Sequence, residues 1–226
     1  MFFRRKLVTR TLVPELQSLL ACWALSRKHH EFCRGATDAE IVRSEQVLGR
    51  TLPVALRALY EMSNGLSLVG ANLNIFPLES GEDDELALVS ASMKLREWGW
   101  NVPDELLVFG DDGSESLFGI WLPRTAGASG DGVIIELGEC ESMAIAGSSL
   151  CRFLRGRTGY YLLSEDAPEA ALDALGLPRE LRNDDPDDEV VALITRWADP
   201  DIEDPLPDPY ESGITAAELR ARFGSL

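Results

Sequence analysis

Two histidines, four cysteines and several pairs of carboxylates are the residues of this 226-residue chain that could bind a metal or take part in acid–base chemistry. On a helix, His29 and Cys33 would form an i, i+4 pair and could supply two metal ligands. A zinc site needs four protein ligands, or three and a water molecule, so this pair is too small. Cys140 stands between Glu139 and Glu141, whose charges disfavour the reactive thiolate. We therefore expect neither a metal centre nor a nucleophilic cysteine.

Paired carboxylates occur at 83–84, 111–112 and 184–185, and their abundance in so acidic a chain lowers their value as a catalytic signal. The run Asp111-Asp112-Gly113 lacks the alternating oxygen ligands of an EF-hand loop and is typical of a turn between strands. The chain contains no phosphate-binding loop, dinucleotide-binding fingerprint, zinc-protease motif or serine-hydrolase elbow. These patterns indicate a binding protein rather than an enzyme, with no catalytic residues and no cofactor.

The charge of the chain indicates the kind of partner. The chain has 21 basic and 38 acidic residues, which gives a net charge of −17. A chain with such a charge repels nucleic-acid phosphates. Residues 165–226 alone hold 17 acidic and 5 basic residues. We therefore expect a basic protein partner, drawn in by electrostatic steering, and no direct contact with nucleic acid.

The cysteines and the first residues bear on localisation. The four cysteines contain no C-x-x-C pair and are too sparse for a disulfide scaffold, which favours reduced thiols in the cytoplasm. The apolar start is interrupted by Arg10, Pro14 and Glu15 before it reaches the length of a membrane span or a signal peptide. We expect a cytoplasmic protein without membrane contact, and an organelle-targeting arm is the alternative.

Helical signals dominate the first 65 residues. Apolar residues recur at helical spacing from residue 14 to about 32, and Thr37 with Glu40 has the form of a capping box for a second helix that ends at Gly49. A third helix follows Pro53, and Asn64-Gly65 ends it. We expect this segment to be wholly helical and the Asn64-Gly65 stop to turn the chain into a sheet, so that Gly65→Val destabilises the fold.

A sheet is predicted after residue 65. Short apolar runs between Gly, Asn and Pro indicate strands in 65–80, and a helix is expected over 86–98. Three further β-type runs, LLVFG, SLFGIWL and GVIIEL, are joined by connections too short for parallel crossovers. They predict an antiparallel meander, followed by a short strand and a helix over about 148–154.

The remainder of the chain has a different texture. Three helical segments alternate with acidic, proline-rich connectors, and Thr215 with Glu218 repeats the capping-box pattern. We expect three parts: a helical lead over 1–36, an α+β domain over 37–164 and an acidic helical appendage over 165–226.

The order of several weak motifs resembles the SUKH superfamily, in particular its branch related to the yeast Smi/Knr regulator of cell-wall synthesis. The resemblance covers roughly residues 37–156. It rests on a helix with Glu before Leu-Gly, then Leu-Pro, an aromatic residue, Asn-Gly, a strand with an acidic-Gly turn, and a closing helix with its Ser and Phe. These positions are Glu45, Leu48, Gly49, Leu52, Pro53, Tyr60, Asn64, Gly65, Phe109, Gly110, Asp112, Gly113, Phe118, Ser148 and Phe153.

The resemblance implies an α+β fold with helices packed on a mainly antiparallel sheet, and extra helices at both termini lie outside it. It also implies a non-enzymatic immunity protein that binds and neutralises a bacterial toxin, often a nuclease. The alternative is a regulatory or scaffold adaptor acting through its acidic surface and tail. Two departures, Glu115 where a second Gly is common and Trp121 where an acidic residue often ends the strand, weaken the transfer of any particular binding surface.

The candidate partner-binding residues come from the loops at the edge of the predicted sheet and a nearby aromatic residue. They are Glu82, Asp83, Asp84, Asp111, Asp112, Glu115 and Trp121. For each carboxylate the alternative is a solvated loop residue that contributes little to binding. For Trp121 the alternative is a place in the core, where large aromatic residues of a small domain are more often found.

Overall fold

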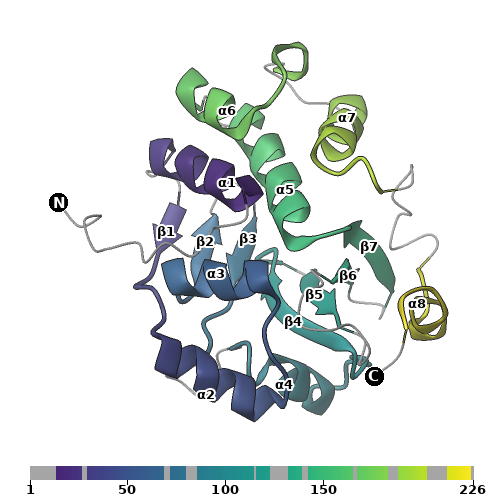
Figure 1. The fold of residues 1–226 in the computed structure, drawn as a ribbon. Helices are drawn as coiled ribbons and strands as arrows, with labels where there is room; N and C mark the ends of the chain where they lie inside the picture. The colour runs from purple at the N-terminus through teal and green to yellow at the C-terminus, as the bar shows by residue number, and fades with distance from the viewer. Residues whose placement is uncertain are drawn as a thin grey trace.

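A seven-stranded antiparallel sheet with helices on both faces forms the described part of the chain in a computed structural model (Figure 1). The structure describes residues 14–26, 30–68, 72–79, 86–114, 116–122, 132–138, 142–164, 167–182, 188–202 and 213–224. The helices are α1 (Pro14–Leu25), α2 (Asp38–Leu48), α3 (Val54–Met62), α4 (Ala91–Glu97), α5 (Leu150–Ser164), α6 (Glu169–Leu175), the 3₁₀ helix η3 (Arg179–Leu181), α7 (Asp188–Ala198) and α8 (Ala216–Phe223). The strands are β1 (His30–Phe32), β2 (Leu66–Leu68), β3 (Leu73–Ile75), β4 (Leu106–Asp111), β5 (Leu117–Trp121), β6 (Ile134–Leu137) and β7 (Met143–Gly147). The predicted α+β class is confirmed.

The local signals at helix ends act as the sequence predicts. The Thr37 side chain accepts a hydrogen bond from the backbone N–H of Glu40, and the Glu40 carboxylate accepts one from the backbone N–H of Thr37 over 2.7 Å. Thr215 and Glu218 form the same capping box at the start of α8. Gly49 ends α2 in the left-handed conformation, with φ +66°. These caps satisfy backbone groups that the first and last helical turns leave without intrahelical partners.

The expectation that the first 65 residues are wholly helical is wrong. Helix α1 ends at Leu25, and His30–Phe32 form the short edge strand β1, which pairs antiparallel with β2. A three-residue strand shows too few alternations for a period of two to be recognised in the sequence. The backbone pairing with β2, which lies more than 30 residues further along the chain, is what makes this segment a strand.

The sheet is a meander in which every strand pairs with its neighbour in sequence, in the order β1 to β7. The predicted antiparallel arrangement of β4, β5 and β6 is confirmed. A register shift interrupts the β4–β5 pairing between Val108 and Gly110. At Gly110 a Cβ atom would lie 2.3 Å from the carbonyl oxygen of Asn74, so a residue with a side chain would push β3 and β4 apart.

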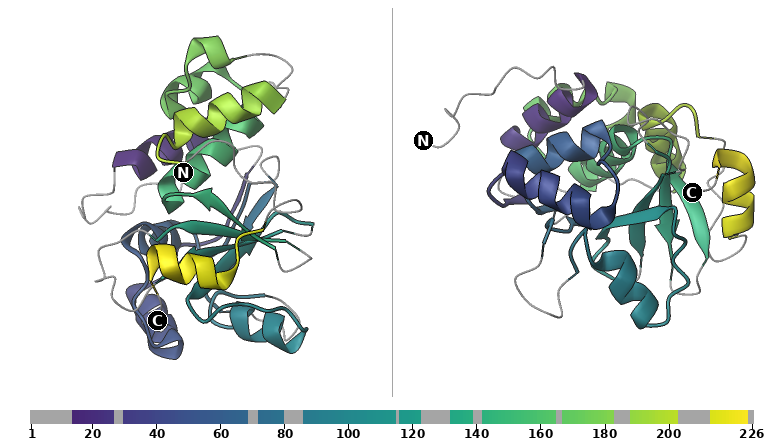
Figure 2. Two further views of the ribbon diagram at one scale, coloured as in Figure 1. Left: turned by 90° about the vertical axis from the view of Figure 1, so that its right-hand side faces the viewer. Right: turned by 60° about the horizontal axis from the view of Figure 1, so that its bottom comes forward.

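Alternate residues of the central strands point to opposite faces of the sheet, and both faces are buried. On one face, Phe109 and Phe118 pack in a core with α1, α2, α3, α5 and α6. On the other face, Val108 and Trp121 pack in a second core with α4 and α8. Figure 2 shows this arrangement from two further sides, with α8 in yellow across the sheet from the α1–α3 group.

Two helices differ in length from the sequence prediction. Helix α4 begins at Ala91 rather than 86, and α5 runs to Ser164, ten residues beyond the predicted end at 154. The glycines at 156 and 159 interrupt the helical signal of α5, because glycine is a poor helix former. At Gly159 a Cβ atom would lie 3.2 Å from Ile194 and 3.3 Å from Trp197, so this glycine allows α5 and α7 to approach closely.

The segments outside the predicted central domain share its cores. Trp23 of α1 is fully buried, and its indole N–H donates a hydrogen bond to the Thr158 hydroxyl of α5 over 3.1 Å. Leu172 of α6 belongs to the core on one face of the sheet, and Leu219 of α8 belongs to the core on the other. The described helices of the lead and the appendage therefore dock on the sheet domain, while the exact division at residues 36 and 164 stays a prediction.

Candidate functional site

The predicted acidic turn at Asp111 and Asp112 joins β4 to β5. The Asp111 carboxylate accepts hydrogen bonds from the side-chain amide of Asn74 (2.7 Å) and the backbone N–H of Gly113 (2.9 Å). The Asp112 carboxylate accepts hydrogen bonds from the backbone N–H groups of Ser114 (2.9 Å) and Ser116 (3.0 Å). Both carboxylates therefore hold the turn, a role that short acidic side chains commonly have in hairpins.

These hydrogen bonds also decide the charge of Asp112. Burial raises the pKa of the Asp112 carboxyl, but the backbone N–H groups of Ser114 and Ser116 and the nearby Arg157 guanidinium together hold this pKa below its usual range. Asp112 is therefore ionised at neutral pH, and its charge is attracted by the positive charge of Arg157 on α5.

The other candidate residues have different outcomes. Glu82, Asp83, Asp84 and Glu115 lie outside the described residues. Trp121 is not a surface residue, which corrects the expectation that it contributes to a binding face. Its side chain is 1% exposed, and its indole N–H donates a hydrogen bond to the carbonyl oxygen of Gly224 over 3.0 Å. The alternative, a core position, is therefore confirmed for Trp121. The sequence did not indicate what covers it, because Gly224, beside α8, lies 103 residues further along the chain.

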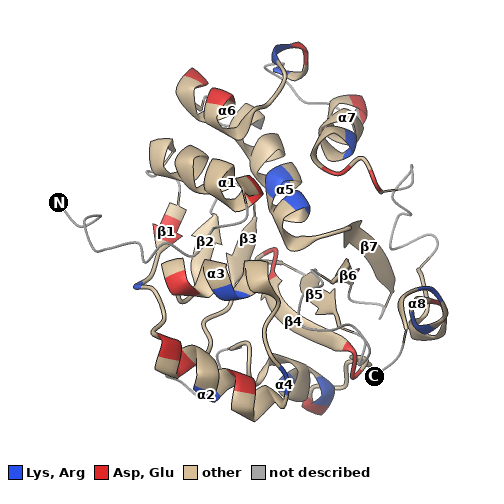
Figure 3. Ribbon diagram, in the orientation of Figure 1, with Lys and Arg blue, Asp and Glu red and all other residues tan. Residues whose placement is uncertain are grey.

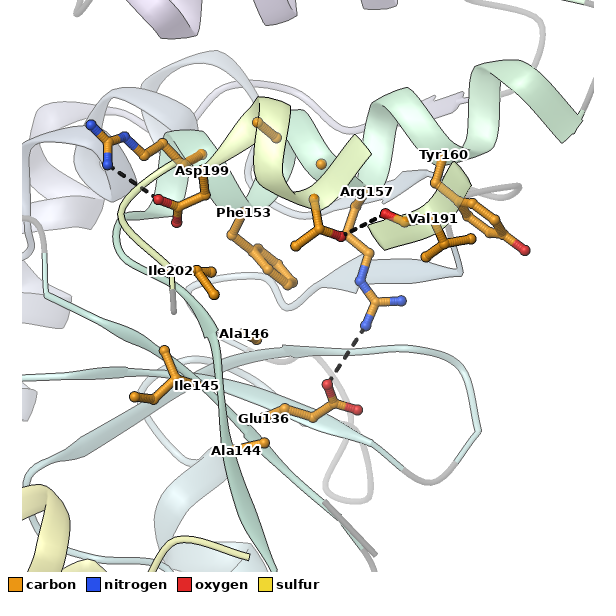
Figure 4. A pocket seen from close by; sticks show the side chains of 14 residues that line it. Glu136, Ala144, Ile145, Ala146, Phe153, Arg157, Tyr160, Val191, Asp199 and Ile202 are labelled. Carbon is orange, nitrogen blue, oxygen red and sulfur yellow. Dashed lines mark hydrogen bonds and ion pairs between the residues drawn. The ribbon is translucent and has the colours of Figure 1, made fainter. Parts of the chain in front are cut away.

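A groove of about 340 Å³ opens between the β6–β7 edge of the sheet, α5 and α7 (Figure 4). We call it the α5–α7 groove. It is lined by Glu136, Ala144, Ile145, Ala146, Arg152, Phe153, Gly156, Arg157, Tyr160, Val191, Thr195, Ala198, Asp199 and Ile202. Most of these residues are apolar, and the small ones leave the space that a larger side chain would fill. The volume lies in the range of sites that bind a ligand or a side chain, about 300–1,000 Å³.

Glu136 and Arg157 are the charged residues on the sheet side of the groove. One oxygen of Glu136 accepts a hydrogen bond from the Ser116 hydroxyl (2.7 Å), and the other lies 4.0 Å from the Arg157 guanidinium, beyond hydrogen-bond distance. The guanidinium carbon lies 4.8 Å from the ring centroid of Phe118 and 5.7 Å from that of Phe153. Ring stacking therefore holds Arg157 as much as its ion pair does.

Asp199 joins the two helices at the other end of the groove. Its side chain is 3% exposed and accepts hydrogen bonds from the backbone N–H (2.6 Å) and the hydroxyl (2.7 Å) of Ser148, in the turn before α5. The Arg152 guanidinium binds Asp199 at 3.1 Å and also pairs with Asp201. The hydrogen bond to Asp201, followed by Asp199, raises the pKa of Arg152 despite partial burial. Arg152 is therefore fully engaged in fixing the helices.

The acidic turn and the groove are neighbours. Ser116, whose backbone N–H binds Asp112, uses its hydroxyl to bind Glu136 in the groove. The sequence placed Asp112 on a possible binding face but missed the groove, because α5 was predicted to end at 154 and α7 was assigned to a separate appendage. The continued apolar pattern at Tyr161 and Leu162 was the signal that α5 extends further.

The histidine and cysteine candidates have structural surroundings. The prediction of a helical His29–Cys33 pair is wrong, because the chain between α1 and α2 forms strand β1. His29 itself lies outside the described residues, as does Cys140.

His30 Nε2 lies 2.9 Å from the Ser26 hydroxyl, and both side chains are buried. Burial raises the pKa of the Cys22 thiol to about 12, against a hydrogen bond with Ser26 that lowers it. Cys22 therefore stays a protonated core thiol at neutral pH.

No group of three or more histidine, cysteine or carboxylate side chains lies close enough to hold a metal ion within the described ranges. None of the helices that the structure describes combines the length and the apolar character needed to cross a lipid bilayer.

Comparison with known proteins identifies the family. No curated protein matches the chain in sequence. The model of the SMI1 / KNR4 family (SUKH-1) matches residues 35–156, which is just over half of the 226 residues. The match contains α2 to α4, β2 to β7 and the first part of α5, while α1, β1 and α6 to α8 lie outside it. On this match, the chain belongs to the SMI1 / KNR4 family (SUKH-1).

Proposed function

We propose that this chain is a non-enzymatic protein-binding domain that binds and neutralises a bacterial toxin. Its partner is then a basic toxin domain, such as a nuclease. The observation that carries the proposal is the charge of −17 on a member of this family. An acidic surface raises the rate of association with a basic protein and disfavours acidic ones. Figure 3 shows that the acidic residues are spread over several helices, among them α2, α3 and α6.

Three buried titratable groups support a role without catalysis, because each is held in the fold by its own partners. Tyr60 donates a hydrogen bond to the carbonyl of Phe76 over 2.8 Å, and burial raises the pKa of its hydroxyl. Glu105 accepts two hydrogen bonds from Arg220 of α8, at 2.7 and 3.0 Å. Asp199 binds the start of α5 as described above. These contacts fix helices and strands to one another.

A regulatory adaptor that acts through its acidic tail is the second candidate. The concentration of 17 acidic and 5 basic residues in 165–226 favours it. Deleting this segment is a poor test of the adaptor, because Leu172 and Leu219 are buried in the two cores of the sheet domain. Substitutions that remove charge without removing packed residues are the better test.

The experiment is co-expression of the full chain with the candidate toxin encoded beside its gene. We expect the chain to restore growth and to form a direct complex whose affinity falls as the salt concentration rises. The tail variant Asp184→Asn/Asp185→Asn/Asp187→Asn should weaken the complex and its dependence on salt. The exposed pair Asp38→Asn/Asp104→Asn is a charge control elsewhere on the surface.

Three outcomes separate the candidates. Rescue of growth with a salt-dependent complex supports toxin neutralisation. Rescue with a complex that is insensitive to salt and to both sets of substitutions removes the electrostatic part of the proposal. No rescue and no complex, from protein that circular dichroism shows to be folded, contradicts toxin neutralisation and favours the adaptor.

A further inference from the structure

We infer that the α5–α7 groove binds a basic segment of a partner protein by taking up one apolar side chain and pairing a neighbouring Lys or Arg with Glu136. The inference rests on the proposed function and names the surface and the partner chemistry for it. It has three supports: the shape and lining of the groove, the state of its charged groups, and the charge of the chain on either side of α7.

The first support is an apolar slot that is large enough to take up a side chain. Phe153 of α5, Val191 of α7 and Ile202 after α7 line the groove from three directions (Figure 4). Gly156 and Ala198 also line the groove, and a Cβ atom at 156 would lie in ordinary contact, 3.5 Å, with the Cβ of Ala198. An inserted Leu, Ile, Met or Phe would be shielded from water on these sides, which is how anchor residues at interfaces contribute most of the binding energy.

The second support is that one charged group in the groove can change partner. Arg152 is engaged by Ser148, Asp199 and Asp201. Arg157 is held over the rings of Phe118 and Phe153.

Glu136 is different. The oxygen that faces Arg157 lies 4.0 Å from the nearest nitrogen and accepts no hydrogen bond from Arg157. An incoming ammonium or guanidinium group could donate to this oxygen without displacing the Ser116 hydroxyl from the other oxygen.

The third support is the charge of the neighbouring sequence. Within the groove, the two arginines are balanced by Glu136 and Asp199. The excess charge belongs to the segments that precede and follow α7 and is acidic. In the sequence these residues are Asp184, Asp185 and Asp187 before α7, Asp188 and Glu189 as its first two residues, and Asp201, Glu203, Asp204, Asp208 and Glu211 after it. The net charge of −17 on the whole chain therefore favours the approach of a cationic segment over that of an anionic one.

The first test measures binding of short peptides to the full chain by fluorescence anisotropy and by backbone amide shifts. The probe is labelled Lys-Arg-Leu-Arg-Lys, compared with the same peptide carrying Ser in place of Leu and with Asp-Glu-Leu-Glu-Asp. We expect saturable binding of the leucine peptide, about tenfold weaker binding of the serine peptide because the apolar anchor is lost, and no binding of the acidic peptide.

Three other results overturn the inference. Equal binding of the leucine and serine peptides would mean that charge alone attracts the probe. Binding of the acidic peptide, or of decanoate, at least as tight as that of the basic leucine peptide would assign the groove to anionic ligands through Arg157. Failure of all probes to bind would also overturn it.

Matched substitutions on α7 locate the binding. Val191→Trp fills the groove, whereas Leu193→Trp adds the same side chain at a position that is 39% exposed and does not line the groove. We expect Val191→Trp to weaken binding of the leucine peptide at least about tenfold and Leu193→Trp to leave it unchanged. If Val191→Trp does not fold, Glu136→Gln keeps the volume and should weaken binding about tenfold by removing a charged hydrogen-bond acceptor.

The same variants separate this inference from the proposed function. If the wild-type chain and Val191→Trp both neutralise the toxin, the groove is not the contact surface, although toxin neutralisation stands. If the wild-type chain does not neutralise the toxin but binds the leucine peptide in the groove, toxin neutralisation fails and the groove serves another basic partner. A second copy of the chain is the remaining possible occupant of the groove, and analytical ultracentrifugation tests for it. A wild-type dimer that Val191→Trp makes monomeric would assign the groove to this second copy and overturn the inference.

Discussion

Asp199, directly after α7, accepts a hydrogen bond of 2.6 Å from the backbone N–H of Ser148, in the turn before α5. A second hydrogen bond of 2.7 Å joins the same carboxylate to the Ser148 hydroxyl. Ser148 lies within the region matched by the family model, and Asp199 lies 43 residues beyond its end. A single buried carboxylate therefore fixes an additional helix of this chain to the domain common to the family.

We predict that Asp199→Ala lowers the free energy of unfolding by about 2–3 kcal/mol, because the buried N–H and hydroxyl of Ser148 and the Arg152 guanidinium all lose a charged acceptor. Urea denaturation followed by circular dichroism measures the change. Asp201→Ala is the control, since its side chain is 67% exposed and should change stability by about 0.5 kcal/mol or less. Equal effects of the two substitutions would contradict the structural role of Asp199.

Helix α8 is predicted to be part of the core rather than a mobile tail. Leu219 is fully buried against the second face of the sheet, so Leu219→Ala should lower the free energy of unfolding by about 2–4 kcal/mol through lost burial and the resulting cavity. Val47→Ala, at a position 65% exposed on α2, is the matched aliphatic control and should change little. A Leu219→Ala protein as stable as wild type in urea would show that α8 does not dock in solution.

Helix α3 ends at Met62 with Ser63 as its C-cap, so Asn64-Gly65 is not the end of the helix that the sequence analysis expected. Gly65 does make the turn into β2, which begins at the next residue. Its φ of +97° is unfavourable for a residue with a side chain, and the backbone atoms of Ile75 and Pro77 lie about 3.5 Å from the position of a Cβ atom. Gly65→Val should therefore destabilise the protein by more than the roughly 1–3 kcal/mol that backbone strain alone costs.

Gly99 provides the matched comparison for Gly65. It has a nearly identical φ of +96°, but no atom lies within 4 Å of its Cβ position. Gly99→Val should therefore show the backbone strain alone, and thermal unfolding of the two variants would separate strain from crowding. A smaller loss of stability for Gly65→Val than for Gly99→Val would contradict this account of the turn.

The turn at Asp112 predicts a pH dependence of stability. The folded protein holds the pKa of this carboxyl below its value in the unfolded chain, which is about 3.9. The stabilisation is therefore complete above this value and is lost as the pH falls through the lower pKa of the folded state. Asp112→Asn should be less stable than wild type at pH 7, and its stability should fall less steeply below about pH 5.

Urea denaturation at a series of pH values tests this prediction. Asp104→Asn, with a side chain 79% exposed, is the control and should retain the wild-type pH dependence. A parallel decline of wild type and Asp112→Asn between pH 5 and pH 3 would show that the hydrogen bonds to Asp112 contribute nothing to acid stability.

Much of the fold could be predicted from local signals in the sequence. The predictions that failed have a common cause. The capping boxes at Thr37 and Thr215 and the meander of β4 to β6 depend on neighbouring residues, and the sequence carries them directly. Strand β1 and the burial of Trp121 depend on partners far along the chain, β2 and α8. Periodicity within a short window contains no information about such partners.

The candidate site shows the same limit. Asp112 could be placed in a turn because Asp-Gly is a local signal, but its hydrogen bonds through Ser116 to the groove residue Glu136 depend on how β5 and β6 pair. The groove itself requires α5 and α7 to lie side by side, and the residues that permit this, Gly156 and Gly159, weaken the helix signal on which a sequence prediction relies.

Helix α5 has a consequence for how the chain unfolds. Its first half belongs to the region matched by the family model, and its second half carries Thr158 and Tyr161, which contact Trp23 and the core beside α1. One continuous helix thus spans the boundary between shared and additional sequence. The additional helices cannot melt without exposing the end of α5, so the described parts should behave as one cooperative unit with a single transition. The additional helices thus extend the domain common to the family through its hydrophobic cores and do not form a second module beside it.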